Sequence, residues 1–159
     1  MAAVAFNREL KKDAVVDESW FSDPRFCEEQ KFWYVLSKTL AEDAAWKFAK
    51  EQGINIITIN PGFVIGPFLQ PSINLSVEMV LNLVNGAESF PDGTHRWVDV
   101  RDVAYAHILA FEVPSASGRY CLVGRSAHAS QVIKILHELY PSHQFPNEQV
   151  LFSLSISSV

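Results

Sequence analysis

The 159-residue sequence carries enough apolar side chains for a folded domain, since 48% of its residues are hydrophobic. Thirteen Lys and Arg stand against eighteen Asp and Glu, a net charge of −5, and no basic tract is present, which argues against a nucleic acid as partner. The two cysteines form no CxxC pair, and the chain has neither a basic leader nor an apolar run of the roughly 18 residues that a membrane span needs. We therefore expect a cytoplasmic protein with no metal site, disulfide framework or membrane anchor.

After a loop-rich opening, helices and strands alternate along the chain. A helix is expected from Glu29 to Gln52, ended by Gly53, and then a short β-branched strand from Ile54 to Asn60 that is buried on both faces. The further elements expected are a turn-rich loop over 61–72, a helix over 73–85, a strand around Trp97–Asp99, a helix from Asp99 to Glu112, a strand over Gly118–Val123 and a helix over Ser130–Leu139. Asp99 is expected to cap the helix that it opens. This alternation predicts an α/β layered fold with a largely parallel sheet.

The segment after Pro146, NEQVLFSLSISSV, has no helical or strand period. We expect residues 147–159 to form a poorly ordered tail that is unrelated to a domain spanning residues 1–146.

Tyr34 and Lys38 are four residues apart in the stretch KFWYVLSKTLAEDAAW, so a helix places them on one face. A phenol with an ordinary pKa of about 10 is a poor proton donor at neutral pH, and a nearby cation brings that pKa down. The lysine could also donate hydrogen bonds to the sugar hydroxyls of a cofactor. On this spacing alone, a half-buried aromatic beside a solvated lysine is the commoner explanation.

A second motif changes that balance. Asn60-Pro61-Gly62 and the residues up to Pro67 follow the expected buried strand, and ligands of α/β sheets bind at the carboxyl ends of strands. Gly62 would let a flat ring approach the backbone closely, and the prolines would hold the loop in one shape. The combination favours a binding site. None of the seven glycines forms a GxGxxG turn, however, so the sequence contains no phosphate cradle.

Three stretches, WYVLSKTLAEDAAWKFAKEQGINIITINPGFVIGP, WVDVRDVAYAHI and SGRYCLV, resemble the extended short-chain dehydrogenase/reductases of plants. Within that family, the likeness is to the group of cinnamoyl-CoA, dihydroflavonol and phenylacetaldehyde reductases. The resemblance implies NADPH-dependent reduction of a carbonyl. Tyr34 would then be the proton donor, Lys38 would bind the nicotinamide ribose and lower the pKa of Tyr34, and the backbone at Pro61, Gly62 and Val64 would face the nicotinamide.

The departures from the family are as informative as the matches. In the family, the glycine-rich turn and the catalytic serine precede the region that aligns with MAAVAFN. We therefore expect the C-terminal part of a Rossmann-like doubly wound parallel sheet without its N-terminal dinucleotide-binding half, an internal piece of a reductase. Cinnamoyl-CoA reductases typically carry a WYCYGK-like stretch where this chain has WYVLSK. An aromatic aldehyde or related phenylpropanoid carbonyl is therefore expected rather than a hydroxycinnamoyl-CoA thioester.

Three interpretations stay open. The chain is a reductase by descent whose missing half comes from a longer form or another chain, an inactive form that binds a full-length homologue through an open sheet edge, or an error of gene prediction. We expect at most trace activity from the chain alone, because nothing in it offers backbone N–H groups to a pyrophosphate. A further expectation is that His107 lies in the core on an apolar helix face.

Overall fold

The computed structural model describes residues 1–11, 13–67 and 69–150. Their contacts divide the chain into two units, one of residues 1–62 and 104–122 and one of residues 63–103 and 123–150. None of the helices in the described residues combines the length and apolar character that crossing a bilayer requires.

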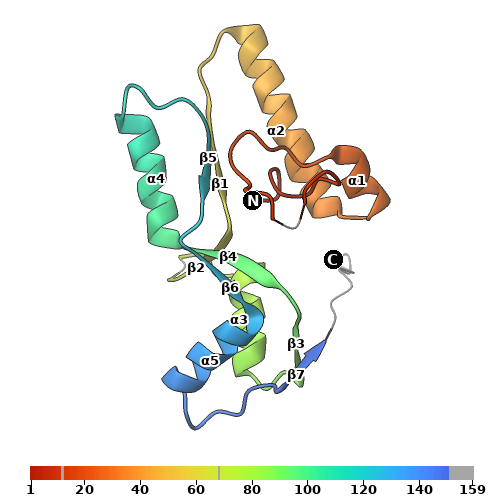
Figure 1. Ribbon diagram of the computed structural model, residues 1–159. Helices are drawn as coiled ribbons and strands as arrows, with labels where there is room; N and C mark the ends of the chain where they lie inside the picture. Colours follow the sequence, from red (N-terminus) through yellow and green to blue (C-terminus); the bar gives the residue numbers. More distant parts are fainter. Residues whose placement is uncertain (12, 68, 151–159) are drawn as a thin grey trace. The chain divides into compact units, whose positions relative to one another are not determined.

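The first unit is built around a pair of parallel strands (Figure 1). Its elements are helices α1 (Pro24–Glu29), α2 (Trp33–Gln52) and most of α4 (Val100–Glu112), and strands β1 (Ile57–Pro61) and β5 (Gly118–Leu122). The pairing runs in register from Ile57 opposite Gly118 to Pro61 opposite Leu122. This arrangement confirms the α/β class, because a helix precedes each strand of a parallel pair.

The second unit contains two small sheets and two helices. Its elements are β2 (Phe63–Ile65), α3 (Leu75–Val84), β3 (Ser89–Pro91), β4 (Thr94–Asp99), β6 (Arg125–His128), α5 (Ala129–Leu139) and β7 (Glu148–Val150). β4 pairs with β2 in parallel and with β6 antiparallel, while β3 and β7 are parallel. The sequence therefore predicted the parallel character only in part, and it did not predict β2, β3, β6 or β7.

Apolar packing is concentrated in the second unit. α3 and α5 enclose a cluster of buried side chains made by Leu83, Phe90, Ala129, Ile133, Leu136 and Phe145. In the first unit the buried apolar side chains are small or medium-sized, namely Ala3, Val4, Cys27, Val35 and Ala49.

Several local expectations need correction. The helix expected from Glu29 is interrupted, because Lys31 has a φ of 58° and α2 begins only at Trp33. All five residues of β1 are half-buried, so the expectation of a strand buried on both faces is wrong; a two-stranded sheet does not cover both faces. His107 is exposed rather than in a core, since α4 buries none of its residues.

The expected helix cap at Asp99 is confirmed, whereas the expected C-terminal tail lies only partly within the described residues. Asp99 accepts a hydrogen bond from the Arg101 backbone N–H at 2.8 Å, as a helix cap should. Hydrogen bonds from Arg101 hold the pKa of Asp99 at about 2. Glu148–Val150 forms strand β7, although an irregular tail was expected there. Its backbone groups pair with those of β3, which satisfies hydrogen-bonding groups on both strands. Residues 151–159 lie outside the described residues.

Candidate active site

The helix α2 presents the tyrosine and lysine that the sequence singled out. It runs from Trp33 to Gln52 and is capped by Gly53, which has a left-handed φ of 64° and donates its N–H to Ala49 O. Tyr34 and Lys38 therefore lie in its first two turns. Lys38 Nζ is 5.5 Å from the centroid of the Tyr34 ring, and both side chains are exposed, Tyr34 to 58%. The ammonium and the phenol thus share one accessible side of the helix, as the spacing predicts.

Contacts farther along α2 set its register against β1. The Glu42 carboxylate accepts a hydrogen bond from Thr58 Oγ1 at 2.9 Å, and α2 reverses direction into β1 through the turn at Gly53. A helix rises about 1.5 Å per residue and a strand about 3.3 Å, so two strand residues match about four helix residues. Asn60 is therefore about level with Lys38, and Gly62, just after β1, is about level with Tyr34.

The end of β1 carries the other expected site residues. Gly62 donates its backbone N–H to Leu122 O at 3.0 Å, and the ammonium of Met1 donates to Pro61 O. Asn60 adds a feature that we did not anticipate. Its side-chain nitrogen Nδ2 is buried and has no hydrogen-bond partner among the described residues. A buried amide donor without an acceptor is unusual and marks a position where a bound group could supply one.

Val64 is placed in the second unit. It lies in β2, and its carbonyl oxygen accepts a hydrogen bond from Ser76 Oγ of α3. The structure thus brings Tyr34 together with Lys38, and Pro61 together with Gly62, within the first unit.

A buried ion pair supports α2, and sequence reasoning missed it. Arg119 of β5 contacts Glu42 with two nitrogens, Nε to Oε1 at 2.7 Å and Nη2 to Oε2 at 2.9 Å, and both side chains are only 8% exposed. Such a two-point contact fixes direction as well as distance. Burial opposes the charged carboxylate, but hydrogen bonds from Arg119, Thr58 and Trp46 outweigh it, and the pKa of Glu42 is lowered.

Arg119 also fastens the N-terminal segment. Its Nη1 donates to Glu18 O at 2.6 Å and to Trp20 O at 2.7 Å, and its guanidinium carbon lies 3.7 Å from the centroid of the Phe21 ring. Tyr34, Lys38 and Glu42 follow one another at four-residue intervals and therefore lie along one side of α2. The side chains at the Tyr34 end of this row are exposed, whereas that of Glu42 is buried. The four-residue spacing of Glu42 from Lys38 was the available signal, but its partner is 77 residues away.

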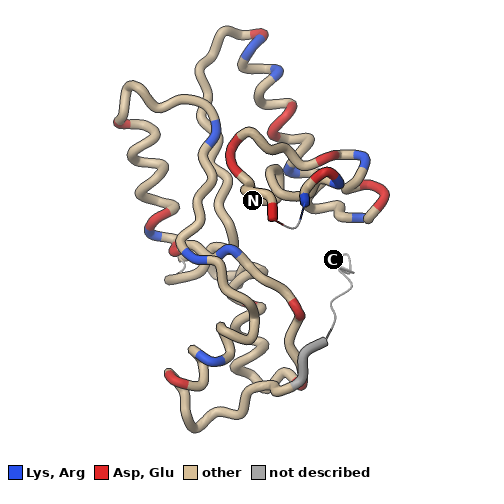
Figure 2. The backbone as a smooth tube through the Cα atoms, in the orientation of Figure 1, with Lys and Arg blue, Asp and Glu red and all other residues tan. Residues whose placement is uncertain are grey.

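Charges of both signs are interspersed along α2 and the N-terminal segment, and Figure 2 shows no basic tract in the described residues. This distribution offers a cofactor single charged groups rather than a broad positive field.

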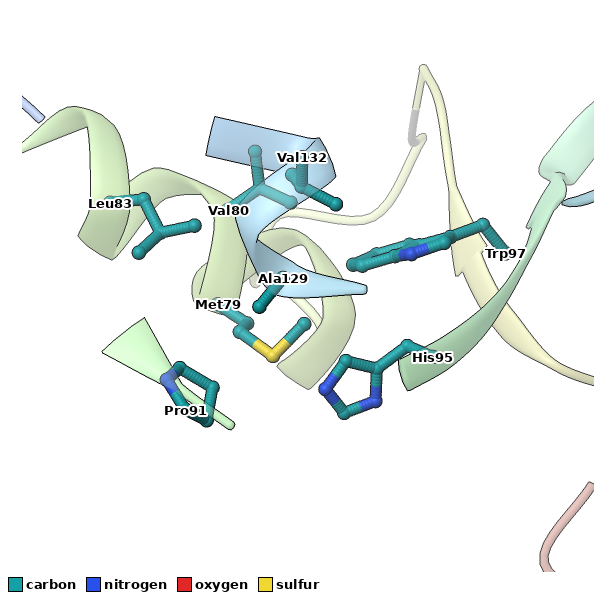
Figure 3. Close-up of a pocket in the computed structure, with 8 residues that line it drawn as sticks. All are labelled: Met79, Val80, Leu83, Pro91, His95, Trp97, Ala129 and Val132. Atoms are coloured by element: carbon teal, nitrogen blue, oxygen red, sulfur yellow. The ribbon is translucent and has the colours of Figure 1, made fainter. Parts of the chain in front are cut away.

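The second unit has a small apolar pocket of its own (Figure 3). It is lined by Met79, Val80, Leu83, Pro91, His95, Trp97, Ala129 and Val132. His95 Nε2 and Trp97 Nε1 are buried and have no hydrogen-bond partner among the described residues. Burial, with a smaller contribution from His128, lowers the pKa of His95. The imidazole is therefore uncharged at neutral pH, which fits an apolar surrounding.

Comparison with known proteins assigns the chain to a family. Residues 14–124 match the model of the NAD dependent epimerase/dehydratase family. The chain therefore belongs to that family, and its α/β elements are part of a Rossmann-like fold.

Plant reductases are among its relatives. The chain is 58% identical over 149 residues to the cinnamoyl-CoA reductase CAD2 of Medicago truncatula, which covers 93% of this chain and 46% of that protein. It is 45% identical to cinnamoyl-CoA reductase 1 of Arabidopsis thaliana over 93% of this chain and 43% of that protein. The chain thus spans about half the length of the curated relatives that it matches.

Solved structures agree with this assignment. Vestitone reductase from alfalfa (Medicago sativa) superposes with a TM-score of 0.81 at 34% identity, over 91% of this chain and 47% of that one. Yeast methylglyoxal/isovaleraldehyde reductase Gre2 complexed with NADPH superposes with a TM-score of 0.76 at 27% identity, over 91% of this chain and 48% of that one.

Proposed function

We propose that this chain carries the proton-donating part of an NADPH-dependent carbonyl reductase. The observation that supports it best is the pairing of Lys38 Nζ with the exposed Tyr34 ring, level with the end of β1. The relatives named above are reductases, and their names point to carbonyl compounds as the class of substrate. An aromatic aldehyde or related phenylpropanoid carbonyl is the substrate that we propose, with a hydroxycinnamoyl-CoA thioester less favoured by the WYVLSK stretch.

The residues present fit one end of the cofactor. Lys38 offers three N–H donors to a ribose, the backbone at Pro61 and Gly62 would face a nicotinamide, and Asn60 Nδ2 lacks an acceptor that a bound group could provide. NADPH, when bound, supplies the hydride. The pyrophosphate has no glycine-rich turn in this sequence, so these residues fit the nicotinamide end alone.

Within this arrangement the side chains have distinct tasks. Tyr34 holds the proton that a carbonyl oxygen takes up as it gains negative charge, and its side chain is exposed, so a substrate can reach it. Lys38 Nζ, 5.5 Å from the centroid of the Tyr34 ring, can donate hydrogen bonds to a cofactor bound on the same side of α2. The Glu42–Arg119 pair holds α2 at the register that keeps both groups level with the end of β1.

The missing phosphate cradle supports a second candidate, an inactive form that acts through binding another polypeptide. Titration of the purified chain with NADPH, followed by cofactor fluorescence, separates the two. If the first candidate holds, Lys38→Ala weakens binding, whereas Tyr34→Phe preserves binding and removes any turnover of an aromatic aldehyde. Absence of binding at millimolar NADPH would exclude a self-contained reductase and favour the second candidate.

A further inference from the structure

The C-terminal end of helix α3 carries the only asparagine of the sequence that is followed by a glycine. Asn85 comes directly after Val84, the last residue of α3, and Gly86 follows it. Every other asparagine precedes a residue with a side chain of its own. The difference matters chemically, because glycine has no Cβ to shield its backbone nitrogen from the side chain before it.

The backbone at this point has the geometry of a helix end. Asn85 is the C-cap of α3 and donates its N–H to Leu81 O. Gly86 has a φ of 89°, and the Ala87 N–H donates to Asn82 O at 3.0 Å, as in a glycine-terminated helix. The positive φ accounts for a glycine at position 86, and it places that glycine directly after an asparagine.

Both residues are open to water and lack polar contacts that would hold them in place. Asn85 and Gly86 are exposed, and apart from the chain neighbours no atom lies within 4 Å of the position that a Cβ on Gly86 would take. In the part of the chain that the structure describes, neither the side-chain amide of Asn85 nor the N–H of Gly86 has a hydrogen-bond partner. The peptide group between the two residues can therefore rotate without breaking a hydrogen bond of its N–H.

We propose that Asn85 is a site of spontaneous chemical modification in which water is the other reactant. The backbone nitrogen of Gly86 attacks Cγ of Asn85, and the new N–C bond closes a succinimide ring. The side-chain nitrogen of Asn85 leaves as ammonia and takes with it the proton of the Gly86 N–H. Water then opens the ring at either of its carbonyl carbons and leaves an aspartate or an isoaspartate at position 85. The reaction changes no oxidation state and needs no second protein.

The product places a negative charge where α3 disfavours one. The C-terminal end of a helix carries partial negative charge on its free carbonyl groups, which repel a carboxylate at the C-cap. The last turn of α3 also holds Leu83 in the apolar cluster of the second unit, with Val84 packed against it. Modification of Asn85 therefore loosens the end of α3 beside this cluster as the protein ages. The proposal is independent of the reductase function, because it concerns the second unit without cofactor or substrate.

The test ages the purified 159-residue chain at neutral pH in water labelled with heavy oxygen, followed by digestion in ordinary water and peptide mass spectrometry. Labelled oxygen at position 85 then dates the conversion to the ageing step. We expect Asn85 to be converted at least about tenfold faster than Asn82, which is exposed on the same helix but precedes Leu83. An unchanged Asn85 would overturn the proposal, and so would equal conversion of Asn82 or an aspartate at position 85 without the label.

Two variants test the effect on α3 by amide hydrogen exchange. Asn85→Asp carries the charge of the product from the start, and the amides in the last turn of α3 should exchange about two- to fivefold faster than in the freshly purified original chain. Asn85→Gln keeps a neutral amide whose ring closure is slower, so its exchange should stay constant during ageing while that of the original chain rises. Equal exchange in Asn85→Asp and the fresh chain would contradict the effect on α3. An aged original chain that is converted at Asn85 but exchanges like the glutamine variant would contradict it as well.

Discussion

Each of the two units is stabilised internally by a different kind of interaction. In the second unit, α3 and α5 bury a cluster of aliphatic and aromatic side chains. In the first unit, a buried ion pair and its hydrogen bonds connect α2, β5 and the N-terminal segment, and large apolar side chains remain exposed. The burial of apolar side chains stabilises a fold but does not favour one orientation of the packed elements. A two-point ion pair, by contrast, requires one relative orientation of its two side chains. The candidate catalytic residues lie in the unit whose geometry is specified in this second way.

The largest effect that would test this contrast is expected from Arg119→Met. It leaves the Glu42 carboxylate buried without its partner, which costs about 3–5 kcal/mol for a buried pair. Hydrogen exchange should show faster opening of α2 and little change in α5. The double variant Glu42→Leu/Arg119→Met is the control and should recover part of the loss, because an apolar pair leaves no isolated charge.

The pH dependence of the same comparison has a defined sign. The pKa of Glu42 is lowered in the folded protein, so its contribution is present above the unfolded value and is lost as the pH falls through the folded value. The difference in the free energy of unfolding between the original chain and the double variant should therefore shrink as the pH falls below the folded-state pKa of Glu42. A difference that stays constant down to strongly acidic pH would show that the ion pair does not stabilise the first unit.

In the second unit, Leu136→Ala removes a side chain from the apolar cluster. Leu136 is 6% exposed, and we expect a loss of about 3 kcal/mol from the cavity and the lost transfer energy. Leu139, on the same helix, is 65% exposed, so Leu139→Ala should change the stability by less than about 0.5 kcal/mol. Denaturant unfolding monitored on α5 measures both; similar losses for the two variants would refute the assignment of this cluster as the core.

The smallest effect concerns the start of α5. His128 Nδ1 accepts the Ser130 N–H at 3.2 Å, and Gln131 Oε1 accepts the His128 N–H at 2.9 Å, so His128 caps the helix. His128→Ala should cost about 1 kcal/mol, while His128→Asn should retain most of the stability, since asparagine is a good cap. Exchange of the first α5 amides measures the difference. An alanine variant as stable as the asparagine variant would mean that the cap contributes nothing.

Local patterns in the sequence determined the features that depend on neighbours a few residues apart. The four-residue spacing of Tyr34 and Lys38, the cap at Asp99 and the helix over Val100–Glu112 follow from the geometry of one helix, and all three are present. The alternation of helices and strands likewise predicted the α/β class.

Only the tertiary structure decided which distant residues meet. Arg119 reaches Glu42 across 77 residues and Thr94 pairs with His128 across the second unit, and no local period encodes such contacts. The exposure of His107 has the same origin, because it depends on what packs against α4. Periodicity reports which faces of an element are apolar, whereas burial also requires a partner to cover them.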